Sequence, residues 1–464
     1  ANPGFVVRIT QAGLDYAHQH GITVLEKELA QLKLQDISGD FRLRHVAKVH
    51  YELSRLDLRS FHLPHSRISL VPNVGLQVAI SNAFAEMDGN WRVKMYFIRD
   101  HGSFDLKVEN IYIKINLKLG SDASGKPTVD TSDCSTRISK VRVLFSGKFG
   151  WLYNLFHSAI ESRFRKILES KVCENVVRSV RNELQPYVRT LPVTARIDAM
   201  AGIDYSLVAP PTATAQSLDV DLKGEFFSLA HRSAVPFSPL ALAFPPDHDR
   251  MVYFGASSYF FNTAGFAYHA AGALVFEITD STVLSPRNGG LCRCPYPLPA
   301  PLQLEKMYPN TPMKLRLSAP SAPFLNIGPG GLSLKPIVDI QAYAILPNSS
   351  LAPLFLLSLT SNVSAVIDVK SGHIVGSLNV GSVWSPALPQ AKALFLPHLF
   401  PPQVRMLQSI MNVFASNILL PQLNARLDQG FPLPLPDRIQ LSNILVRFHQ
   451  NFLLLGADVH YQPR

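Results

Sequence analysis

The chain has 464 residues, too many for one ordinary hydrophobic core, so its length predicts two or three domains. Hydrophobic residues make up 47% of it, yet no window approaches the roughly 18 consecutive apolar residues that a membrane-spanning helix needs. The formal net charge is +10, divided as an excess of five basic residues in 1–230 and five in 231–464. A basic surface attracts anionic partners, either nucleic acid, acidic glycans, or phospholipid and phosphorylated glycolipid head groups. Because no nucleic-acid-reading motif is present, we expect no nucleic acid.

The first 230 residues predict a helix, then antiparallel strands, then a second and longer helix. Apolar residues in 10–33 recur with the helical period, although Gly21 interrupts it. From about 40 to 146 the pattern changes to alternation, with turn-forming clusters at 86–90, 100–103 and 120–133. The predicted strands are Phe41–Leu43, His50–Leu58, Ile68–Val71, Gly75–Ile80, Trp91–Phe97, Phe104–Leu119 and Arg137–Phe145.

Residues 150–183 form the longest predicted helix, and we expect the strands to pack on it. No helix breaker occurs between Trp151 and Leu184, and apolar residues recur at steps of three and four. Cys173 lies near the end of this helix, and a bridge to Cys134 would tie the helix to the sheet. Two unpaired buried thiols are the alternative. The apolar stripe comprises Leu152, Leu155, Phe156, Ala159, Ile160, Phe164, Ile167, Leu168 and Val172.

The second half repeats this order after a connector. Residues 230–247 are rich in proline and poor in charge, which predicts a stiff, partly extended linker. A helical candidate at Gly255–Ala271 follows, and a second long amphipathic helix is predicted at 404–423. Two similar domains, 1–229 and 248–464, explain this repeat, and chance similarity of two unrelated units is the alternative. The strands predicted between the two helices are Met313–Leu317, Gly331–Ile345, Leu354–Ile367 and His373–Val380.

Catalytic and metal-binding motifs are missing from the sequence. It contains no G-x-S-x-G elbow, glycine-rich phosphate loop, H-E-x-x-H or C-x-x-C pair, so we expect neither an enzyme nor a metal site. Cys292 and Cys294 are too close for the usual zinc spacing, and either pair with another chain or stay reduced. Asn348 and Asn362 begin glycosylation motifs, and the chain starts without methionine, as a processed secreted chain would.

Two clusters of basic residues in the predicted strands are candidate binding residues. The first comprises Arg42, Arg44 and Lys48, and the second comprises Arg92, Lys94 and Arg99. The aromatic residues interleaved with the second cluster are Trp91, Tyr96 and Phe97. If 91–99 form a hairpin, cations and aromatic rings project at one tip, which suits an interface of phosphates over acyl chains. The alternative is a solvated strand face beside core aromatic residues.

Eight segments, spread over nearly the whole chain, share a family pattern. They are ANPGFVVRITQAGLDYA at 1–17, ISLVPNVGLQVAISNA at 68–83, GWLYNLFHSAIES at 150–162, ELQPYVRTLPV at 183–193, AGIDYSLVAPP at 201–211, HDRMVYFGASSYFFNTAGFAYHAAG at 248–272, AILPNSSLAPLF at 344–355 and HQNFLLLGADVHY at 449–461. These segments resemble the family of bactericidal/permeability-increasing and lipopolysaccharide-binding proteins, to which the phospholipid and cholesteryl ester transfer proteins are more distantly related.

The resemblance implies an α+β fold, a boomerang of two pseudo-repeated barrels joined by a central sheet. Each barrel is a twisted antiparallel sheet wrapped on a long amphipathic helix, and each holds a phospholipid in an apolar groove, with no other cofactor. The helix residues that would line the two grooves are Leu152, Leu155, Phe156, Ile160, Phe164, Val404, Leu407, Met411 and Phe414. The family disulfide falls on Cys134 and Cys173. The lipopolysaccharide-binding surface of the family, at the amino-terminal barrel tip, matches Arg42, Arg44, Lys48, Arg92 and Arg99, with Lys94 as a partial replacement for a denser basic run.

The function implied by the resemblance is that of a secreted or secretory-granule protein of innate immunity. Such a protein binds lipid A of lipopolysaccharide and phospholipid, disrupts Gram-negative outer membranes, and acts as a monomer. The alternatives are a shuttle that presents lipopolysaccharide to a host receptor, and a phospholipid transfer protein. The even charge split and the uncharged Asn90, Met95 and Tyr96 depart from the bactericidal pattern and weaken the killing prediction more than the binding one. Segments 285–304 and 381–402 lack the family pattern.

Overall fold

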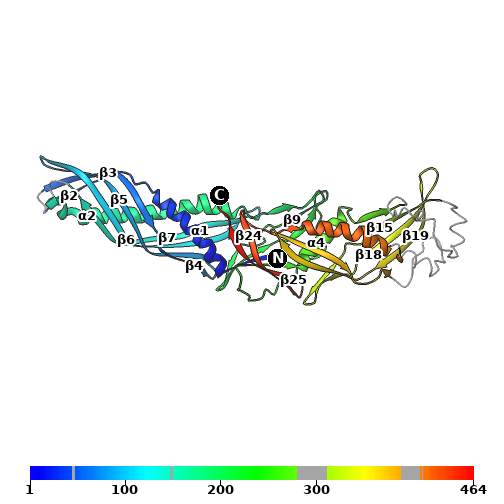
Figure 1. The fold of residues 1–464 in the computed structure, drawn as a ribbon. Helices are drawn as coiled ribbons and strands as arrows, with labels where there is room; N and C mark the ends of the chain where they lie inside the picture. Colours follow the sequence, from blue (N-terminus) through cyan, green and yellow to red (C-terminus); the bar gives the residue numbers. More distant parts are fainter. Residues whose placement is uncertain (44–46, 147–149, 280–310, 388–407, 410) are drawn as a thin grey trace.

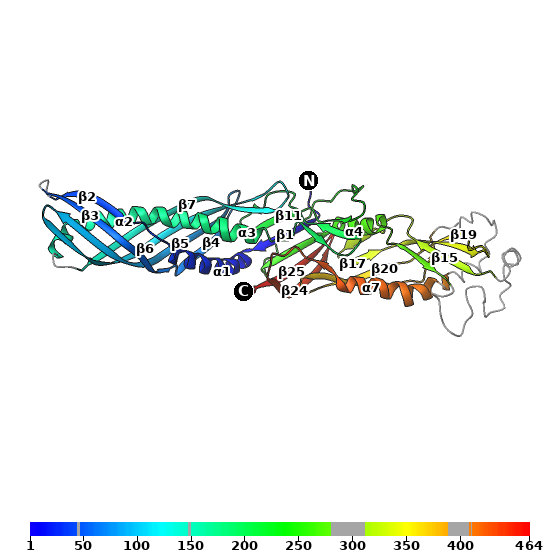
Figure 2. The same ribbon diagram turned by 90° about the horizontal axis from the view of Figure 1, so that it is seen from above.

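The computed structural model describes residues 1–43, 47–146, 150–279, 311–387, 408–409 and 411–464, without the side chains of 43 and 150–156. The molecule is elongated, with curled sheets at both ends and a shared sheet in the middle, near which both termini lie (Figures 1 and 2). This arrangement confirms the predicted α+β class with a joining sheet. In the part of the chain described, no helix is both long enough and apolar enough to cross a bilayer.

The amino-terminal half is a long antiparallel sheet that curls around two helices. The strand order is β2-β3-β5-β6-β7, and β4 also pairs with β5. Alternating apolar and polar residues make these strands, because successive side chains point to opposite faces of a sheet. The strands are β2 (Ile37–Leu43), β3 (Ala47–His62), β4 (His65–Val71), β5 (Gly75–Met95), β6 (Ile98–Ser121) and β7 (Pro127–Phe145).

The predicted helices of this half are present. Helix α1 spans Gln11–Ala30, and the Thr10 side chain caps its first turn by accepting from the Gly13 N–H. Helix α2 spans Gly150–Ser179 and continues through η1 (Val180–Leu184) into α3 (Gln185–Val188). Most of its described apolar residues are buried against the sheet, namely Ile160, Phe164, Leu168, Val172 and Val176. Of the other predicted stripe residues, Ile167 is half-buried and Ala159 is exposed, so the stripe is narrower than predicted at Ala159. Burial of such side chains contributes roughly 1.5–3 kcal/mol each before the cost in entropy.

Three predicted turns between the strands are wrong or misplaced. The polar cluster at 86–90 lies inside β5, because its side chains alternate with the buried Ala85, Met87 and Trp91. Residues 100–103 likewise lie inside β6. Within 120–133 the turn is confined to the five residues 122–126, because β6 ends at Ser121 and β7 begins at Pro127. Asp122 Oδ1 closes this turn by accepting hydrogen bonds from the backbone N–H groups of 124 and 126. Polar residues on the solvated face of a long strand resemble a turn in composition alone.

The central sheet contains strands from both halves of the chain. Its order is β10-β11-β1-β13-β25-β24, and β1 pairs with β11 on one side and with β13 on the other. These strands are β1 (Phe5–Thr10), β10 (Thr212–Ala213), β11 (Ser217–Leu222), β13 (Val252–Ser257), β24 (Ile439–His449) and β25 (Phe452–Tyr461). A separate small sheet contains β8 (Thr194–Arg196), β9 (Ala201–Asp204) and β12 (Glu225–Ser228). The domain boundaries stay predictions.

The carboxy-terminal half contains two five-stranded sheets. One has the order β14-β15-β18-β19-β22, with strands Val275–Ile278, Met313–Ser318, Ile337–Ile345, Leu351–Thr360 and Ser385–Pro386. The other has the order β16-β17-β20-β21-β23, with strands Leu325–Gly328, Gly331–Leu334, Val363–Lys370, His373–Val380 and Phe431–Pro432. The helices are α4 (Ser258–Ala270), η2 (Ala415–Leu419) and α7 (Leu420–Gln429). The helix predicted from 255 begins three residues later, because 255–257 complete β13.

Residues 230–247 contain no helix or strand, but they are held against the central sheet. Arg8 of β1 donates from Nη1 to the Pro245 carbonyl at 2.8 Å, and its guanidinium lies 4.3 Å from the centre of the Phe244 ring. Phe244 in turn stacks on Phe452 of β25 at 6.2 Å. The segment predicted as a stiff, partly extended linker therefore lies against the central sheet, where Arg8 and Phe452 contact it.

Candidate functional site

The β5–β6 hairpin closes the end of the amino-terminal sheet that is remote from the central sheet (Figure 1). Strand β5 ends at Met95 and β6 begins at Ile98, so Tyr96 and Phe97 form a two-residue turn. Tyr96 takes the left-handed backbone conformation that such tight turns require, with φ +52°. Phe97 is 93% exposed and Tyr96 is 65% exposed. The predicted hairpin is present, and it carries two aromatic rings into solvent.

Strand alternation turns the basic residues near this hairpin to the outer face of the sheet. In β5 the exposed Arg92 and Lys94 alternate with the buried Trp91 and Val93. The Trp91 indole donates from Nε1 to the carbonyl of Ser103 at 3.0 Å, which fixes β5 against β6. Trp91 is therefore a core residue, and the cations beside it face water.

The register between strands gathers these cations into one surface four strands wide. Arg42 of β2 faces Lys48 of β3, and Lys94 of β5 faces Arg99 of β6. Strand β3 pairs with β5 so that Lys94 faces His50, two residues along β3 from Lys48. The two pairs therefore lie in adjacent rows on the same face of the sheet. We call this surface the tip patch, and it comprises Arg42, Lys48, Arg92, Lys94 and Arg99. Arg44, the sixth predicted residue, lies outside the described residues.

The tip patch presents more free cations than anions. Among the residues that the structure describes, Arg42, Arg92, Lys94 and Arg99 have no carboxylate within 4.0 Å, while Lys48 Nζ lies 3.4 Å from Asp40 Oδ2. Farther along the same sheet the charges are mixed, as at Arg59, which lies within 3.3 Å of Asp88 and within 3.2 Å of Asp105. A surface with unpaired guanidinium and ammonium groups is suited to bind phosphate oxygens.

A histidine held by two carboxylates lies within the tip patch, and sequence reasoning missed it. His50 Nδ1 lies 2.7 Å from Asp40 Oδ1, and its Nε2 lies 3.5 Å from Glu52 Oε1. The alternation Lys48-x-His50-x-Glu52 is the sequence signal that places these side chains on one strand face. The contact with Asp40 depends on the pairing of β2 with β3, which no local pattern reveals.

These contacts change the acidity of both partners. The pKa of His50 is raised above its ordinary value, first by the hydrogen bond to Asp40 and further by the one to Glu52. The pKa of Asp40 is lowered, first by the hydrogen bond from His50 and also by Lys48. Both shifts favour the charged form of the group.

The described groove residues lie in the cores of the two barrels. Ile160 and Phe164 of α2 are 1% and 0% exposed, and the Phe164 ring lies 5.8 Å from that of Phe104 in β6. Met411 and Phe414 are buried in the carboxy-terminal core. The side chains of Leu152, Leu155 and Phe156, and the whole of Val404 and Leu407, lie outside the described residues.

Partly exposed apolar side chains lie at the edge of the amino-terminal core. Ile22 and Leu25 of α1 and Leu70 of β4 pack against it without being fully covered. Sequence reasoning assigned Ile22 and Leu25 to a helix stripe, but it did not distinguish an edge position from a central one.

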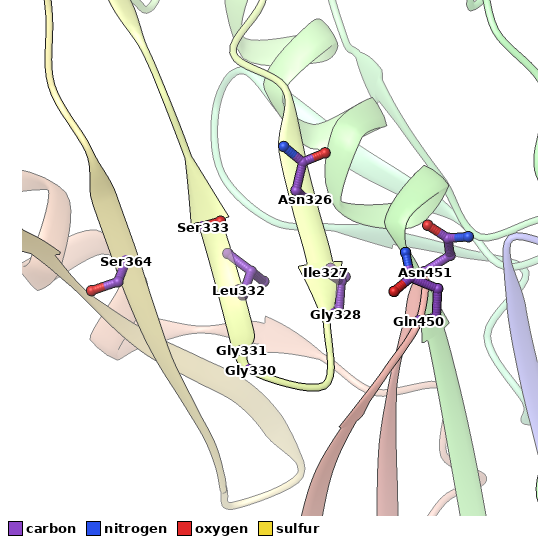
Figure 3. Close-up of a pocket in the computed structure, with 10 residues that line it drawn as sticks. All are labelled: Asn326, Ile327, Gly328, Gly330, Gly331, Leu332, Ser333, Ser364, Gln450 and Asn451. Carbon is purple, nitrogen blue, oxygen red and sulfur yellow. The ribbon is translucent and has the colours of Figure 1, made fainter.

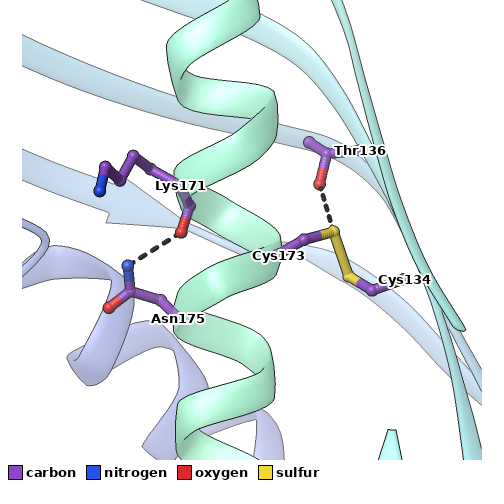
Figure 4. Close-up of a disulfide and its surroundings, with 5 residues drawn as sticks. All are labelled: Cys134, Thr136, Lys171, Cys173 and Asn175. Atoms are coloured by element: carbon purple, nitrogen blue, oxygen red, sulfur yellow. Dashed lines mark hydrogen bonds between the residues drawn. A yellow bond between two sulfur atoms is a disulfide. The ribbon is translucent and has the colours of Figure 1, made fainter. Parts of the chain in front are cut away.

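A disulfide joins β7 to α2. Cys134 and Cys173 are bonded, and the Thr136 hydroxyl lies 3.2 Å from Cys173 Sγ (Figure 4). One turn before the cysteine, Glu169 Oε1 accepts a hydrogen bond from the Ile138 N–H at 3.1 Å. The cross-link and this hydrogen bond fix the helix on the inner face of the sheet, as the bridge predicted between the two cysteines would. Cys292 and Cys294 lie outside the described residues.

A crevice of about 460 Å³ lies in the carboxy-terminal half, beside the end of the central sheet (Figure 3). The β16–β17 hairpin, Ser364 of β20 and the turn between β24 and β25 form its walls. Its polar side chains are uncharged, and comprise Asn326, Ser333, Ser364, Gln450 and Asn451. Across the described residues, no group of three or more histidine, cysteine or acidic side chains is placed to hold a metal ion.

Comparisons with known proteins agree with this architecture. Residues 13–187 match the N-terminal domain and residues 195–461 the C-terminal domain of the LBP / BPI / CETP family. The chain is 44% identical to the lipopolysaccharide-binding protein of Homo sapiens and 38% identical to the bactericidal permeability-increasing protein of Rattus norvegicus. Each alignment covers 99% of this chain and 94% of the relative.

A solved structure gives the same result in three dimensions. The crystal structure of a lipopolysaccharide binding protein aligns with a TM-score of 0.66 and 41% identity over the full length of both chains. The two domain matches together cover most of the sequence, and the alignment with the human relative covers 99% of this chain. The chain therefore belongs to the LBP / BPI / CETP family.

Proposed function

We propose that this protein binds the lipid A part of lipopolysaccharide through the tip patch. The observation that carries the proposal is the arrangement of Arg42, Lys48, Arg92, Lys94 and Arg99 on one exposed face beside a turn with two exposed aromatic rings. The guanidinium and ammonium groups engage lipid phosphates and displace the divalent ions that bridge neighbouring lipids. Phe97 and Tyr96 enter the layer below the phosphates, because aromatic rings favour that boundary.

The biological role that we propose is disruption of Gram-negative outer membranes by a secreted or granule-stored protein of innate immunity. Relatives over the full length are named lipopolysaccharide-binding protein and bactericidal permeability-increasing protein, which supports an extracellular lipid-binding role. The protein acts as a monomer and without catalysis.

A second candidate role is presentation of lipopolysaccharide to a host receptor without killing. The identities favour it, since five lipopolysaccharide-binding proteins are 40–44% identical to this chain, whereas the two bactericidal relatives are 38% and 35% identical. Killing of Gram-negative bacteria in the absence of host cells supports the first role, and receptor-dependent cell activation without killing supports the second. Bulk phospholipid transfer, the third role, is measured as lipid movement from vesicles to lipoproteins.

Phospholipid held in the two barrels is part of the proposal. Acyl chains enter beside α2 at the partly exposed edge near Ile22 and Leu25, because Ile160 and Phe164 are fully covered. Extraction of the purified protein and mass spectrometry of the extract identify such lipids. We also propose N-glycosylation at Asn348 and Asn362, both of which are exposed beside turns that start or end strands. A mass shift on removal of N-glycans checks it.

The lipid A proposal is tested with a pair of charge reversals. We expect Lys94→Glu with Arg99→Glu to weaken binding of lipid A vesicles by about 2–4 kcal/mol, which is roughly 30- to 1,000-fold in Kd, since each reversal removes an attraction and adds a repulsion. The measurement is a fluorescence titration of labelled lipid A at several salt concentrations. The salt dependence of the variant should also be weaker, because fewer ions are released on binding.

The matched control reverses Arg163 and Lys166, which are exposed on α2 and away from the tip patch. This control makes the same change in net charge, so it corrects for long-range attraction between a basic protein and an anionic vesicle. Equal loss of affinity in both double variants would show that net charge, rather than the tip patch, governs binding.

A further inference from the structure

His50 lies in the tip patch between two carboxylates, and only its protonated form can donate to both. Its two ring nitrogens face two different carboxylates, Asp40 at 2.7 Å and Glu52 at 3.5 Å. A neutral imidazole has one N–H and donates to only one of them, whereas the imidazolium has two and donates to both. The geometry around His50 therefore matches the charged ring.

The carboxylates that hold His50 also lie beside the lipid-binding cations. Asp40 Oδ2 lies 3.4 Å from Lys48 Nζ, and Glu52 faces Arg92 across the β3–β5 pairing. When His50 is neutral, these two carboxylates attract Lys48 and Arg92 and oppose an approaching phosphate. When His50 is charged, its positive charge offsets the two carboxylates, so Lys48 and Arg92 attract an anionic ligand more strongly.

Charged groups surround His50 on every neighbouring strand. Strand β2 contributes Asp40 and Arg42, and β3 contributes Lys48 and Glu52. Strand β5 contributes Arg92 and Lys94, of which Lys94 directly faces His50, while β6 contributes Arg99 and His101 opposite these two. The cations oppose protonation of His50, but Asp40 at 2.7 Å and Glu52 at 3.5 Å favour it, and the pKa of His50 is raised. His50 is therefore half-protonated at a pH above the ordinary histidine pKa of about 6.5.

We propose that His50 makes the tip patch acid-responsive, so that its protonation strengthens binding of phosphate-bearing lipid. This inference rests on the proposed function of the tip patch as the lipid A site. It adds a regulation of that site, in which a fall in pH from neutral to mildly acidic raises the affinity by neutralising Asp40 and Glu52. The effect is modest, because the groups are exposed to water.

The test compares the native protein with His50→Gln, which keeps hydrogen-bonding groups but cannot gain a proton. Affinity for diphosphoryl lipid A vesicles is measured at about pH 8 and about pH 5.5, on either side of the ordinary histidine pKa. Lipid phosphates also titrate near pH 6, so the quantity of interest is the ratio of the two affinities at each pH. We expect the native protein to bind on the order of 2- to 5-fold more tightly than the variant at the lower pH, and equally at the higher pH.

The control is His65→Gln, on β4 of the same sheet and away from the tip patch. The ratio of the lipid A affinity of His65→Gln to that of the native protein should be the same at both pH values. An unchanged ratio in His50→Gln, with binding intact, would overturn the inference and leave the proposed function standing. Absence of binding at both pH values in the native protein would overturn both.

A second measurement does not depend on any ligand. Nuclear magnetic resonance titration of the His50 ring should give a pKa above the ordinary histidine value of about 6.5, and Asp40→Asn should lower it. A His50 pKa at or below about 6.5, with Asp40 intact, would overturn the inference even if lipid binding proved acid-sensitive.

Discussion

Replacement of Phe164 by alanine probes how the interior of the amino-terminal barrel is filled. Phe164 is 0% exposed in α2, and its ring packs 5.8 Å from that of Phe104. Loss of a fully buried phenylalanine ring from a packed core lowers the free energy of unfolding by about 3–5 kcal/mol, through lost burial and the cavity that remains. We expect a loss of this size in the lipid-free protein.

The assay is urea unfolding of lipid-stripped protein, followed by tryptophan fluorescence. With a slope of about 3 kcal/mol per molar urea, the expected loss lowers the midpoint by about 1–2 M. The matched variant is Phe97→Ala, whose ring is exposed and whose loss should cost less than about 0.5 kcal/mol. Equal midpoints for the two variants would refute the packing argument. If added phospholipid restores the free energy of unfolding that Phe164→Ala loses, Phe164 lies in the wall of a lipid groove.

Three further results are expected. Replacing Cys134 and Cys173 together by serine should lower the free energy of unfolding by about 4 kcal/mol, because the cross-link closes a long loop; an unchanged melting temperature would contradict this. Phe97→Ser should weaken insertion into lipid A monolayers about 10-fold or more, since about 1.5–3 kcal/mol of apolar burial is lost, and equal rises in surface pressure would argue against an inserted ring. Burial raises the pKa of Asp204, but hydrogen bonds to its carboxylate from Ser206 and Arg232 outweigh that effect. The pKa of Asp204 is therefore lowered. The ionised Asp204 stabilises the fold at pH values above the ordinary aspartate pKa of about 4, and this stabilisation is lost as pH falls below it. On acidification, the midpoint of urea unfolding should therefore fall less in Asp204→Asn than in the native protein.

Much of the fold follows from periodicity in the sequence. The helix predicted from 150 to 184 is present because its apolar residues keep the helical period. In the described part of the predicted stripe, Ile160, Phe164, Leu168 and Val172 are buried, whereas Ala159 is exposed. The sequence pattern predicts several short strands where the structure has one long strand, because the acidic and amide residues at 86–90 resemble a turn in composition. The true turn contains Tyr96 and Phe97, two residues typical of strands, so no composition rule marks it.

The candidate site was only partly predictable for a related reason. Alternation within β5 places Arg92 and Lys94 on one face, and the sequence shows this directly. The pairing of Arg42 with Lys48, and of Asp40 with His50, depends on the register between strands. Register is set by the whole sheet, so local patterns do not reveal that a histidine bridges two carboxylates within the basic surface.

The central claim is that phosphate-bearing lipid binds at the tip patch. Hydrogen exchange with and without diphosphoryl lipid A, read by mass spectrometry of peptides, tests it over the whole molecule at once. Lipid bound at the tip patch should slow exchange in the β5–β6 hairpin around residues 92–99, and in the neighbouring β2 and β3, with little change in β16 and β17. Protection confined to the crevice beside β16 and β17, with an unchanged hairpin, would contradict it.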